Sequence, residues 1–305
     1  FSYHLSAQVP SYVPSDGLVG YWPFDGNAND ESGNGNDGTV TDAILTADRY
    51  SNANSAYNFD YAGYANGALD DMIYIAHNNS FNTSGLTVSC WFKPTAWSYP
   101  GNPGSQAVFK RVETGYSTPP GEFWYIVFTD DGTLIGGVSD DNQGGTNIVS
   151  NAGDISLNNW YNVVLTYDGQ TEKLYLDGVL VGSQTGTNLL SVQGNSGLSF
   201  GVSLQANGYW RPFNGDIDDS GIWNRALSES EIQQIYSSCT TPITLNSIPD
   251  RSSCGADLVS LTASTTHTYS VDVTATSSMD FTFAGDFSGT DPVMNVSVGD
   301  TVVFN

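Results

Sequence analysis

The sequence predicts an all-β fold, an antiparallel β-sandwich followed by a second, truncated β-domain, and three observations lead to this prediction. Short runs rich in Val, Ile, Tyr, Phe and Trp recur between clusters of Gly, Asn, Asp and Ser, as in antiparallel strands joined by turns. Two Asp-Gly pairs join three of these runs into a meander, and helical periodicity is confined to one short segment. The 305 residues, 39% of them hydrophobic, are enough for one large sandwich core and a smaller piece.

The first expected strand and the loop after it occupy residues 17–39, GLVGYWPFDGNANDESGNGNDGT. Between its glycines this segment carries Asp, Asn and Glu side chains at eight positions from 25 to 37. Oxygen donors on a tight, glycine-rich loop are what a hard cation such as Ca²⁺ needs. The alternative is an ordinary turn, because Asn and Gly also dominate turns that bind nothing.

The central strands follow in residues 86–94, LTVSCWFKP, and in the meander of residues 160–183. Its strands are expected at 160–167, 173–176 and 179–183, with Asp-Gly turns at 168–169 and 177–178. Cys90 occupies an alternating position where a small buried thiol fits the sandwich interior. Trp91 and Trp160 also lie in strand motifs, and we expect both in the core.

One short helix is expected at 228–236, where Ser228 and Glu231 have the spacing of a capping box. A shift to Ser, Thr and Pro after it marks a domain boundary. From His267 the sequence alternates again, and it stops at Asn305 within an expected strand, which suggests a fragment of a longer protein. We therefore predict a signal-peptide remnant and leader at 1–15, a first β-domain at 16–237, a linker at 238–262 and a truncated β-domain at 263–305.

The leader FSYHLSAQ ends like a secretory signal peptide, with small residues at Ser6 and Ala7, so we expect a secreted or cell-surface protein cleaved near Ala7 or Gln8. Cys239 and Cys254 lie 15 positions apart, a spacing that fits a disulfide in an exported protein. Neither a CxxC pair nor a nearby histidine accompanies them, which argues against zinc.

The charge balance limits the partners. The chain has 32 acidic and 8 basic residues and a formal charge of -24, which would repel nucleic acid and anionic membrane surfaces. No run approaches the roughly 20 apolar residues of a membrane helix, so we expect no membrane insertion. Neutral glycans and cations are easier partners. The alternative is that the acidity only keeps an extracellular protein soluble.

The segment 17–39 resembles the opening of the LamG-like jelly-roll family, the laminin G and concanavalin A-like lectin/glucanase type of sandwich found in secreted bacterial, Bacteroidetes-like proteins. Residues 48–60, 86–94, 160–183 and 213–236 match the family in the same order, and with the opening segment they frame residues 16–237, about three quarters of the chain. The ending VSVGDTVVFN weakly resembles a strand of cupredoxin-like domains. Blue copper needs two His and a Cys, and only His267 is present there.

The resemblance implies a calcium site. In LamG-like proteins the segment GDIDDSG closes back beside the first strand, and its acidic pair supplies oxygen atoms to the cation. Alternation places Asp218 and Asp219 on opposite faces of a strand, so without a bulge only one can reach the site, and we expect Asp219. The alternative is that Asp216 and Asp218 face solvent on an exposed strand. The expected Ca²⁺ ligands are Asp25, Asn27, Asp30 and Asp219.

Loop aromatic residues are the second candidate site. Sugar rings stack on Trp and Tyr, while amides and charged groups bind their hydroxyls. For any one of these residues, simple packing is the alternative reading, and a cluster would favour binding. The expected ligand-binding residues are Trp97, Tyr99, Tyr116, Tyr209, Trp210 and Arg211.

The sequence does not predict an enzyme. Retaining glycosidases of this sandwich type need two carboxylates about 5 Å apart, carried on one strand face as E-x-D-x-x-E. None of the six glutamates begins that motif, and HExxH is absent. We expect a non-catalytic, calcium-stabilised extracellular module for carbohydrate or protein binding and adhesion. The alternatives are a structural spacer of a large surface adhesin, or an accessory module of a polysaccharide-degrading enzyme whose catalytic domain lies outside this chain. The ligand and the oligomeric state stay open.

Overall fold

The computed structural model describes most of the first 238 residues and seven short backbone segments beyond them. The larger of its two compact units includes Ser15–Glu229, and the smaller consists of Pro10–Pro14 and Ser230–Asn305. Side chains are described only up to residue 237, and not for residues 112, 122–123, 146, 203–205 and 208–210. The described residues are 9–60, 71–97, 104–112, 122–138, 146–186, 196–205, 208–238, 242–244, 261–262, 267–275, 281–285, 289–290, 295–297 and 300–304.

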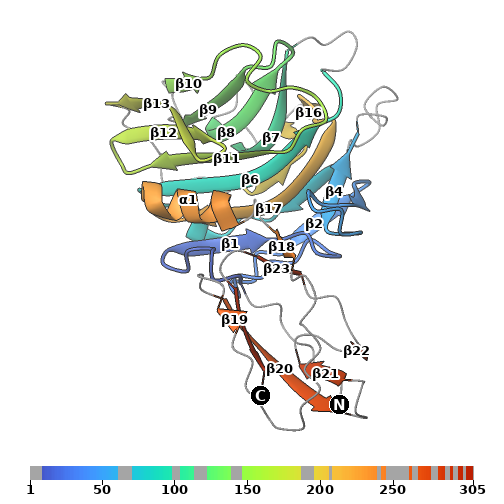
Figure 1. Cartoon of the computed structure of the whole chain (residues 1–305). Coiled ribbons are helices and arrows are strands. Elements are labelled where there is room, and N and C mark those ends of the chain that lie inside the picture. Colours follow the sequence, from blue (N-terminus) through green and yellow to red (C-terminus); the bar gives the residue numbers. More distant parts are fainter. Residues whose placement is uncertain are drawn as a thin grey trace. The chain divides into compact units, whose positions relative to one another are not determined.

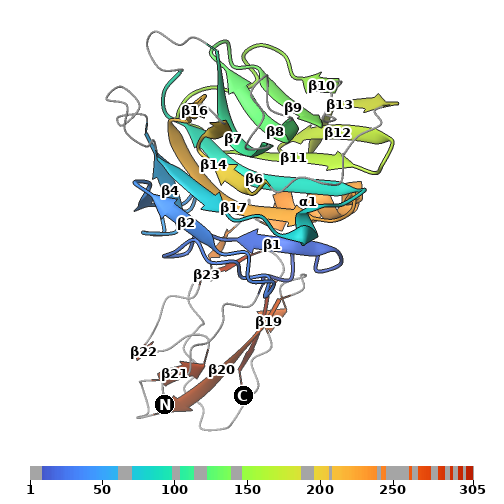
Figure 2. The same cartoon turned by 180° about the vertical axis from the view of Figure 1, so that it is seen from behind.

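The larger unit is an antiparallel jelly-roll sandwich, as the sequence predicted (Figure 1). One sheet has, in spatial order, β13 (Val179–Thr185), β12 (Thr171–Leu176), β11 (Tyr161–Tyr167), β6 (Leu86–Pro94), β17 (Gly215–Trp223), β4 (Ala56–Phe59) and β3 (Ile44–Thr46), and β1 (Leu18–Trp22) also pairs with β17. The other has β10 (Thr146–Val149), β9 (Leu134–Val138), β8 (Glu122–Thr129), β7 (Ser105–Val112), β14 (Leu198–Phe200), β5 (Met72–Ile75) and β2 (Gly38–Thr41). Seen from behind, β1, β2 and β4 lie at one edge and β10 and β13 at the other (Figure 2).

The core lies between the two sheets and is rich in aromatic rings. Trp22, Phe109 and Phe200 are fully buried, and the rings of Phe109 and Phe200 stack with centroids 4.0 Å apart. Trp22 meets Phe200 edge-on at 5.8 Å, an arrangement that aromatic rings prefer. Cys90 has no exposed surface and is part of this core, which confirms its predicted place.

The meander and the helix confirm the predictions made for them. Strands β11, β12 and β13 pair in sequence, and both residues of the Asp177-Gly178 turn have positive φ angles of 49° and 73°. This pair is the turn type that a two-residue hairpin requires. The helix α1 spans Glu229–Ser238, and a single-turn 3-10 helix spans Asn79–Phe81.

Of the two tryptophans expected in the core, Trp91 is buried and Trp160 is only half-buried. Cys90 and Phe92 point into the core, so the residue between them, Trp91, lies on the other face of the sheet. It is nevertheless buried, with 4% of its surface exposed. Trp160 precedes β11, is half-buried and lies outside the core, with the Lys93 ammonium 5.3 Å from its ring centroid. Both tryptophans therefore belong to the outer face of the first sheet.

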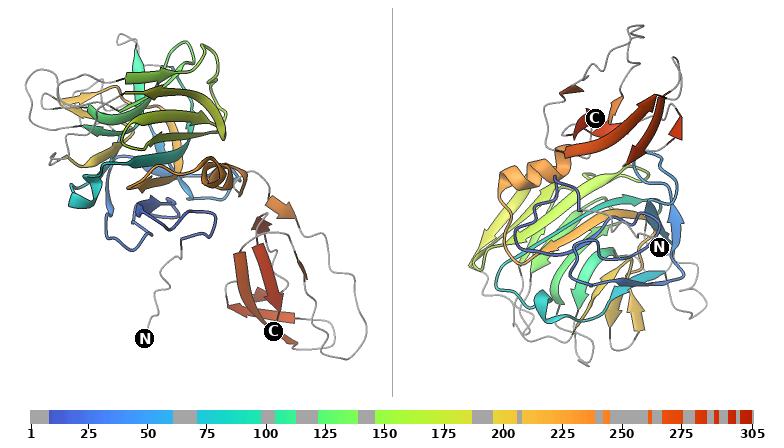
Figure 3. Two further views of the ribbon diagram at one scale, coloured as in Figure 1. Left: turned by 90° about the vertical axis from the view of Figure 1, so that its left-hand side faces the viewer. Right: turned by 90° about the horizontal axis from the view of Figure 1, so that it is seen from below.

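The smaller unit contains short strands, drawn orange to red in Figure 3. The described backbone forms one sheet in the order β19 (Leu261–Thr262), β24 (Asp300–Phe304), β20 (His267–Ala275), β21 (Phe281–Gly285) and β22 (Gly289–Thr290), and β18 (Pro242–Thr244) pairs with β23 (Asn295–Ser297). Strands β20 and β24 are parallel. The predicted domain limits and the cupredoxin resemblance stay predictions. Cys239 and Cys254 lie outside the described residues. Within the described residues, no helix is long and apolar enough to cross a membrane.

Candidate functional site

The oxygen-rich loop after β1 is organised around the buried side chain of Asp30. One carboxylate oxygen accepts backbone N–H bonds from Tyr21 at 3.0 Å and Ser32 at 2.9 Å, and the other accepts the N–H of Asn36 at 2.9 Å. Asp37 in turn accepts the backbone N–H of Asp30 at 2.9 Å. The Asp30 carboxylate thus closes the loop by satisfying three backbone donors.

Asparagine side chains fix the rest of this loop to β1. The Asn34 amide donates to the carbonyls of Leu18 and Val19, both at 3.1 Å, and the Asn36 amide donates to the Val19 carbonyl at 2.8 Å. The buried indole of Trp22 donates to the backbone carbonyl of Asn36 at 2.9 Å. Several polar groups of the segment that suggested a metal site therefore serve to hold the loop together.

The acidic pair lies where β17 is interrupted by a bulge. The pairing of β17 with β6 shifts between Asp218 and Gly221, and Asp219 has a φ angle of 37°. The bulge lifts the strict alternation of the strand, so both carboxylates approach the same group, the guanidinium of Arg49. The condition for only one of the pair to reach a shared site, an unbulged strand, therefore does not hold, and Asp218 is buried and does not face solvent. Asp216 is buried too and forms an ion pair with Lys93 at 2.5 Å.

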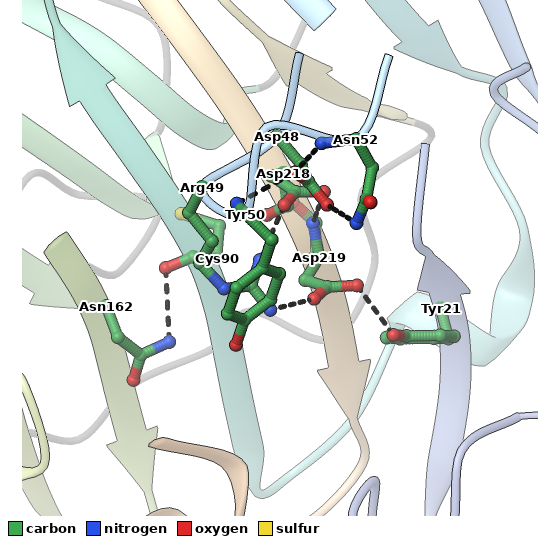
Figure 4. Close-up of polar contacts among 10 residues, drawn as sticks. Tyr21, Asp48, Arg49, Tyr50, Asn52, Cys90, Asn162, Asp218 and Asp219 are labelled. Atoms are coloured by element: carbon green, nitrogen blue, oxygen red, sulfur yellow. Dashed lines mark hydrogen bonds and ion pairs between the residues drawn. The ribbon is translucent and has the colours of Figure 1, made fainter. Parts of the chain in front are cut away.

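The Arg49 guanidinium is the centre of this cluster (Figure 4). Its Nη1 lies 2.5 Å from Oδ2 of Asp218, and its Nη2 lies 2.6 Å from Oδ2 of Asp219. The exposed fractions of the three side chains are 7% for Arg49, 2% for Asp218 and 15% for Asp219, so these ion pairs are largely shielded from water. The second oxygen of Asp219 accepts the Tyr21 hydroxyl at 2.7 Å, which connects the cluster to β1.

Two aromatic rings and a tight turn hold Arg49 in place. The guanidinium carbon lies 4.6 Å from the ring centroid of Trp91 and 4.7 Å from that of Tyr50, both within the range of cation–π attraction. The Asp48 carboxylate accepts the backbone N–H groups of Tyr50 and Asn52, each at 2.8 Å, and so fixes the turn that presents Arg49. The outward face of Trp91 is buried because Arg49 lies over it.

The surroundings of the cluster raise the pKa of two carboxyl groups, those of Asp218 and Asp25. Burial raises the pKa of the Asp218 carboxyl well above its usual value, the neighbouring Asp219 raises it further, and Arg49 opposes both effects. Asp25 is exposed as a residue, yet protein atoms around its carboxylate partly desolvate it and raise its pKa. A hydrogen bond from Ser55 lowers the pKa of Asp25, while Asp219 and Asp48 raise it. Asp25 therefore faces the same negative region.

The four expected calcium ligands do not fit a calcium ion in this arrangement. Calcium takes about six to eight oxygen ligands, but Asp30 is buried against backbone donors and Asp219 is paired with Arg49. Asn27 is exposed, and its side-chain oxygen accepts the N–H of Asn29 at 2.7 Å in a local turn. No group of three or more His, Cys, Asp and Glu side chains that could hold a metal occurs among the described residues.

Described residues beside two of the loops expected to bind a ligand are hydrogen-bonded at the start of β7. The Gln106 side chain donates to the carbonyl of Ala96 at 3.0 Å and accepts the N–H of Asn214 at 2.9 Å. Thr95 also donates its N–H to the Asn214 carbonyl at 2.9 Å, and Ala107 donates to the Arg211 carbonyl at 2.9 Å. Residues 95–96, which precede Trp97, and residues 211–214, which follow Trp210, are thus held together at the start of β7.

The expected ligand-binding residues are placed unequally. Trp97 is partly buried, with its ring centroid 6.4 Å from that of Phe128. Arg211 is half-buried with a φ angle of 58°. Tyr209 and Trp210 lie in β16 (Gly208–Trp210), which pairs with β15 (Ser203–Gln205), and their side chains lie outside the described part, as do Tyr99 and Tyr116 entirely. The sequence analysis missed Arg49 and Gln106. Arg49 had one visible signal, as one of only 8 basic residues in the chain.

Comparisons with known proteins place this geometry in a family. The model of the concanavalin A-like lectin/glucanases superfamily matches residues 66–233, more than half of the chain. The binding domain of Paraclostridial Mosquitocidal Protein 1 is similar with a TM-score of 0.60 and 18% identity, over 88% of this chain and 63% of that one. No curated protein sequence matches the chain.

Two further solved structures hold sugars. Domain 4 of AbnA, a GH43 extracellular arabinanase from Geobacillus stearothermophilus in complex with arabinotriose, has a TM-score of 0.54 and 18% identity, over 72% of this chain and 98% of that domain. The botulinum neurotoxin serotype D ligand binding domain in complex with N-acetylneuraminic acid has a TM-score of 0.51 and 17% identity, over 73% of this chain and 51% of that one. The chain spans only about half the length of the botulinum structures, and identities this low establish the fold alone.

Proposed function

The chain belongs to the concanavalin A-like lectin/glucanases superfamily, and from this premise we propose that its sandwich is a secreted, non-catalytic module that binds a neutral glycan. The observation that carries the proposal is the convergence of the Trp97 loop and the segment after Trp210 on Gln106. Lectin sites combine aromatic rings with a few fixed polar groups in this way.

The charge of the chain selects among glycans. With a formal charge of -24, the surface repels acidic sugars and favours neutral ones. Of the two similar structures in complex with sugars, the arabinanase domain binds a neutral arabinotriose and the neurotoxin domain binds an acidic sugar. We therefore propose a neutral oligosaccharide of the kind released from plant or microbial polysaccharides as the ligand.

The module is proposed to bind without turnover because the sequence lacks the E-x-D-x-x-E motif of the related glucanases. The buried Glu172 has a structural role instead, since its carboxylate accepts the backbone N–H of Val138 at 3.0 Å. Calcium is not part of the proposed binding function.

The proposal is tested by calorimetry of the full chain with neutral arabinan-, glucan- and xylan-derived oligosaccharides. Replacing a stacked ring in Trp210→Ala or Trp97→Ala should cost about 1 kcal/mol, roughly a fivefold loss of affinity. The control is Leu180→Ala, which removes an exposed apolar side chain from the edge strand β13 and should leave affinity unchanged. Since Trp97 also packs on Phe128, its variant is measured well below its melting temperature.

Three results would contradict the proposal. Equal affinities of wild type and both tryptophan variants would move the site elsewhere on the sandwich. Release of reducing sugar from a polysaccharide by the purified chain would show catalysis. Failure to bind any neutral glycan would favour the structural spacer.

A further inference from the structure

We propose that Arg49 is a resident cation of this fold, whose guanidinium supplies the positive charge that the sequence pattern assigned to calcium. The stability of the sandwich is then independent of calcium. This inference concerns the Arg49 cluster, defined as Arg49, Asp218 and Asp219 with the rings of Tyr50 and Trp91, and it holds whether or not the module binds a glycan.

The first argument is that the acidic pair already has its counter-ion. Each aspartate receives one nitrogen of the same guanidinium, at 2.5 Å and 2.6 Å, and the second oxygen of Asp219 accepts the Tyr21 hydroxyl. A calcium ion bound to either carboxylate would lie directly against the guanidinium. Like charges at such a distance repel strongly where water is largely excluded.

The second argument is that Arg49 is built into its position. Guanidinium is weakly hydrated and stacks on aromatic faces, so it tolerates burial better than an ammonium group. The rings of Trp91 and Tyr50, and the turn fixed by Asp48, restrict the side chain. A long side chain that is already restricted loses less conformational entropy when it forms its ion pairs.

The third argument is that the cluster joins the strands that a metal would have joined. Arg49 lies between β3 and β4, the acidic pair lies on β17, and Tyr21 lies on β1. The ion pairs and the hydroxyl bond therefore connect segments 169 to 198 positions apart in the chain. A cation at this junction closes the sheet edge, and Arg49 provides it from within the chain.

The test measures thermal unfolding of the full chain in EDTA and in about 10 mM Ca²⁺, well above the dissociation constants of about 10⁻⁴–10⁻³ M that are usual for extracellular modules. A bound calcium ion would raise the Tm by about 3–10 °C. We expect the wild-type Tm to be the same in both conditions.

The variants test the role of the charge. Arg49→Met keeps much of the stem between the two rings but leaves Asp218 buried and unpaired, so its Tm should fall by about 10 °C near neutral pH. Asp218→Asn in the Arg49→Met background removes the buried charge and keeps an oxygen to accept the N–H of Asp219, now 2.8 Å away. It should recover at least half of the loss, which a purely packing role of Arg49 would not allow. Lys173→Met, at an exposed ion pair, is the control.

The outcomes separate cleanly. A wild-type Tm raised by several degrees in Ca²⁺ would overturn the proposal, and so would an Arg49→Met variant as stable as Lys173→Met. If Arg49→Met does not fold, the double variant still decides, because a folded double variant supports the charge argument and an unfolded one contradicts it.

Discussion

Tyr21 lies between two carboxylate arrangements that solve the same problem in different ways. Its backbone N–H donates to Asp30, whose carboxylate accepts two further backbone donors. Its hydroxyl donates to Asp219, which with Asp218 is neutralised by Arg49. The first arrangement satisfies a carboxylate with neutral dipoles, and the second satisfies two carboxylates with one full charge.

The difference shows which buried carboxylate depends on neighbours in the sequence and which depends on a distant partner. The backbone donors to Asp30 come from residues two to nine positions away, so strand β1 and its loop themselves supply the hydrogen bonds that stabilise this carboxylate. Asp218 depends on Arg49, 169 positions away. Loss of that partner leaves an uncompensated buried charge, whereas loss of a local donor removes one hydrogen bond.

The sharpest way to break the local arrangement is Asp30→Ala, which leaves three backbone donors without their acceptor. The bonds from Tyr21 and Asn36 are buried, so the free energy of unfolding should fall by about 3 kcal/mol or more. Asp30→Asn keeps one acceptor oxygen and should lose roughly half as much. Urea unfolding measures both values.

The matched control for Asp30 is Asn27→Ala in the same loop. Its side chain is exposed and accepts one local N–H, from Asn29, so the change should stay within about 0.5 kcal/mol. If Asp30→Ala were as mild as Asn27→Ala, the loop would not depend on the Asp30 carboxylate.

A pH series tests the charged arrangement by a smaller effect. The raised pKa values of Asp218 and Asp25 mean that the folded protein binds more protons than the unfolded one. Stability should therefore rise as the pH falls from neutrality through the folded-state pKa values, until the unfolded value of about 3.9 is reached. We expect the Tm to increase by a few degrees between neutral pH and the onset of acid unfolding.

Salt and one variant identify the group behind this pH dependence. High salt screens the repulsion among exposed carboxylates such as Asp25 but acts weakly on the buried Asp218. The increase should persist in high salt and shrink in Asp218→Asn. A Tm that falls steadily on acidification of the wild type would show that the folded-state pKa of Asp218 is not raised.

Most of the fold could be predicted from the sequence because its signals are local. The Asp177-Gly178 turn, the alternation that buries Cys90 and the capping spacing at Ser228 each depend on a few neighbouring residues. Trp91 is buried as expected, although the same alternation places it on the face opposite Cys90. The sequence did not reveal what covers Trp91 on that face, because Arg49 comes from a different strand connection.

The site could be predicted only in part. The sequence shows the oxygen-rich loop and the acidic pair. It does not show which of their oxygen atoms already accept hydrogen bonds from other groups of the protein. Asp30 accepts local backbone donors, and the bulge at Asp219 lets both members of the pair reach Arg49. Neither the bulge nor the pairing over 169 positions leaves a mark in the sequence near the pair.

The smallest expected effect comes from an exposed ion pair that makes the contrast with Arg49. Lys173 lies 3.3 Å from Glu229, but 37% and 68% of these side chains are exposed, and water screens their attraction. Lys173→Met should change the free energy of unfolding by less than about 0.5 kcal/mol, and high salt should remove the difference. Measured beside Arg49→Met, this variant separates the effect of burial from that of losing a positive charge in an acidic chain. A loss at Lys173 as large as that at Arg49 would mean that overall charge balance, and not the buried cluster, controls stability.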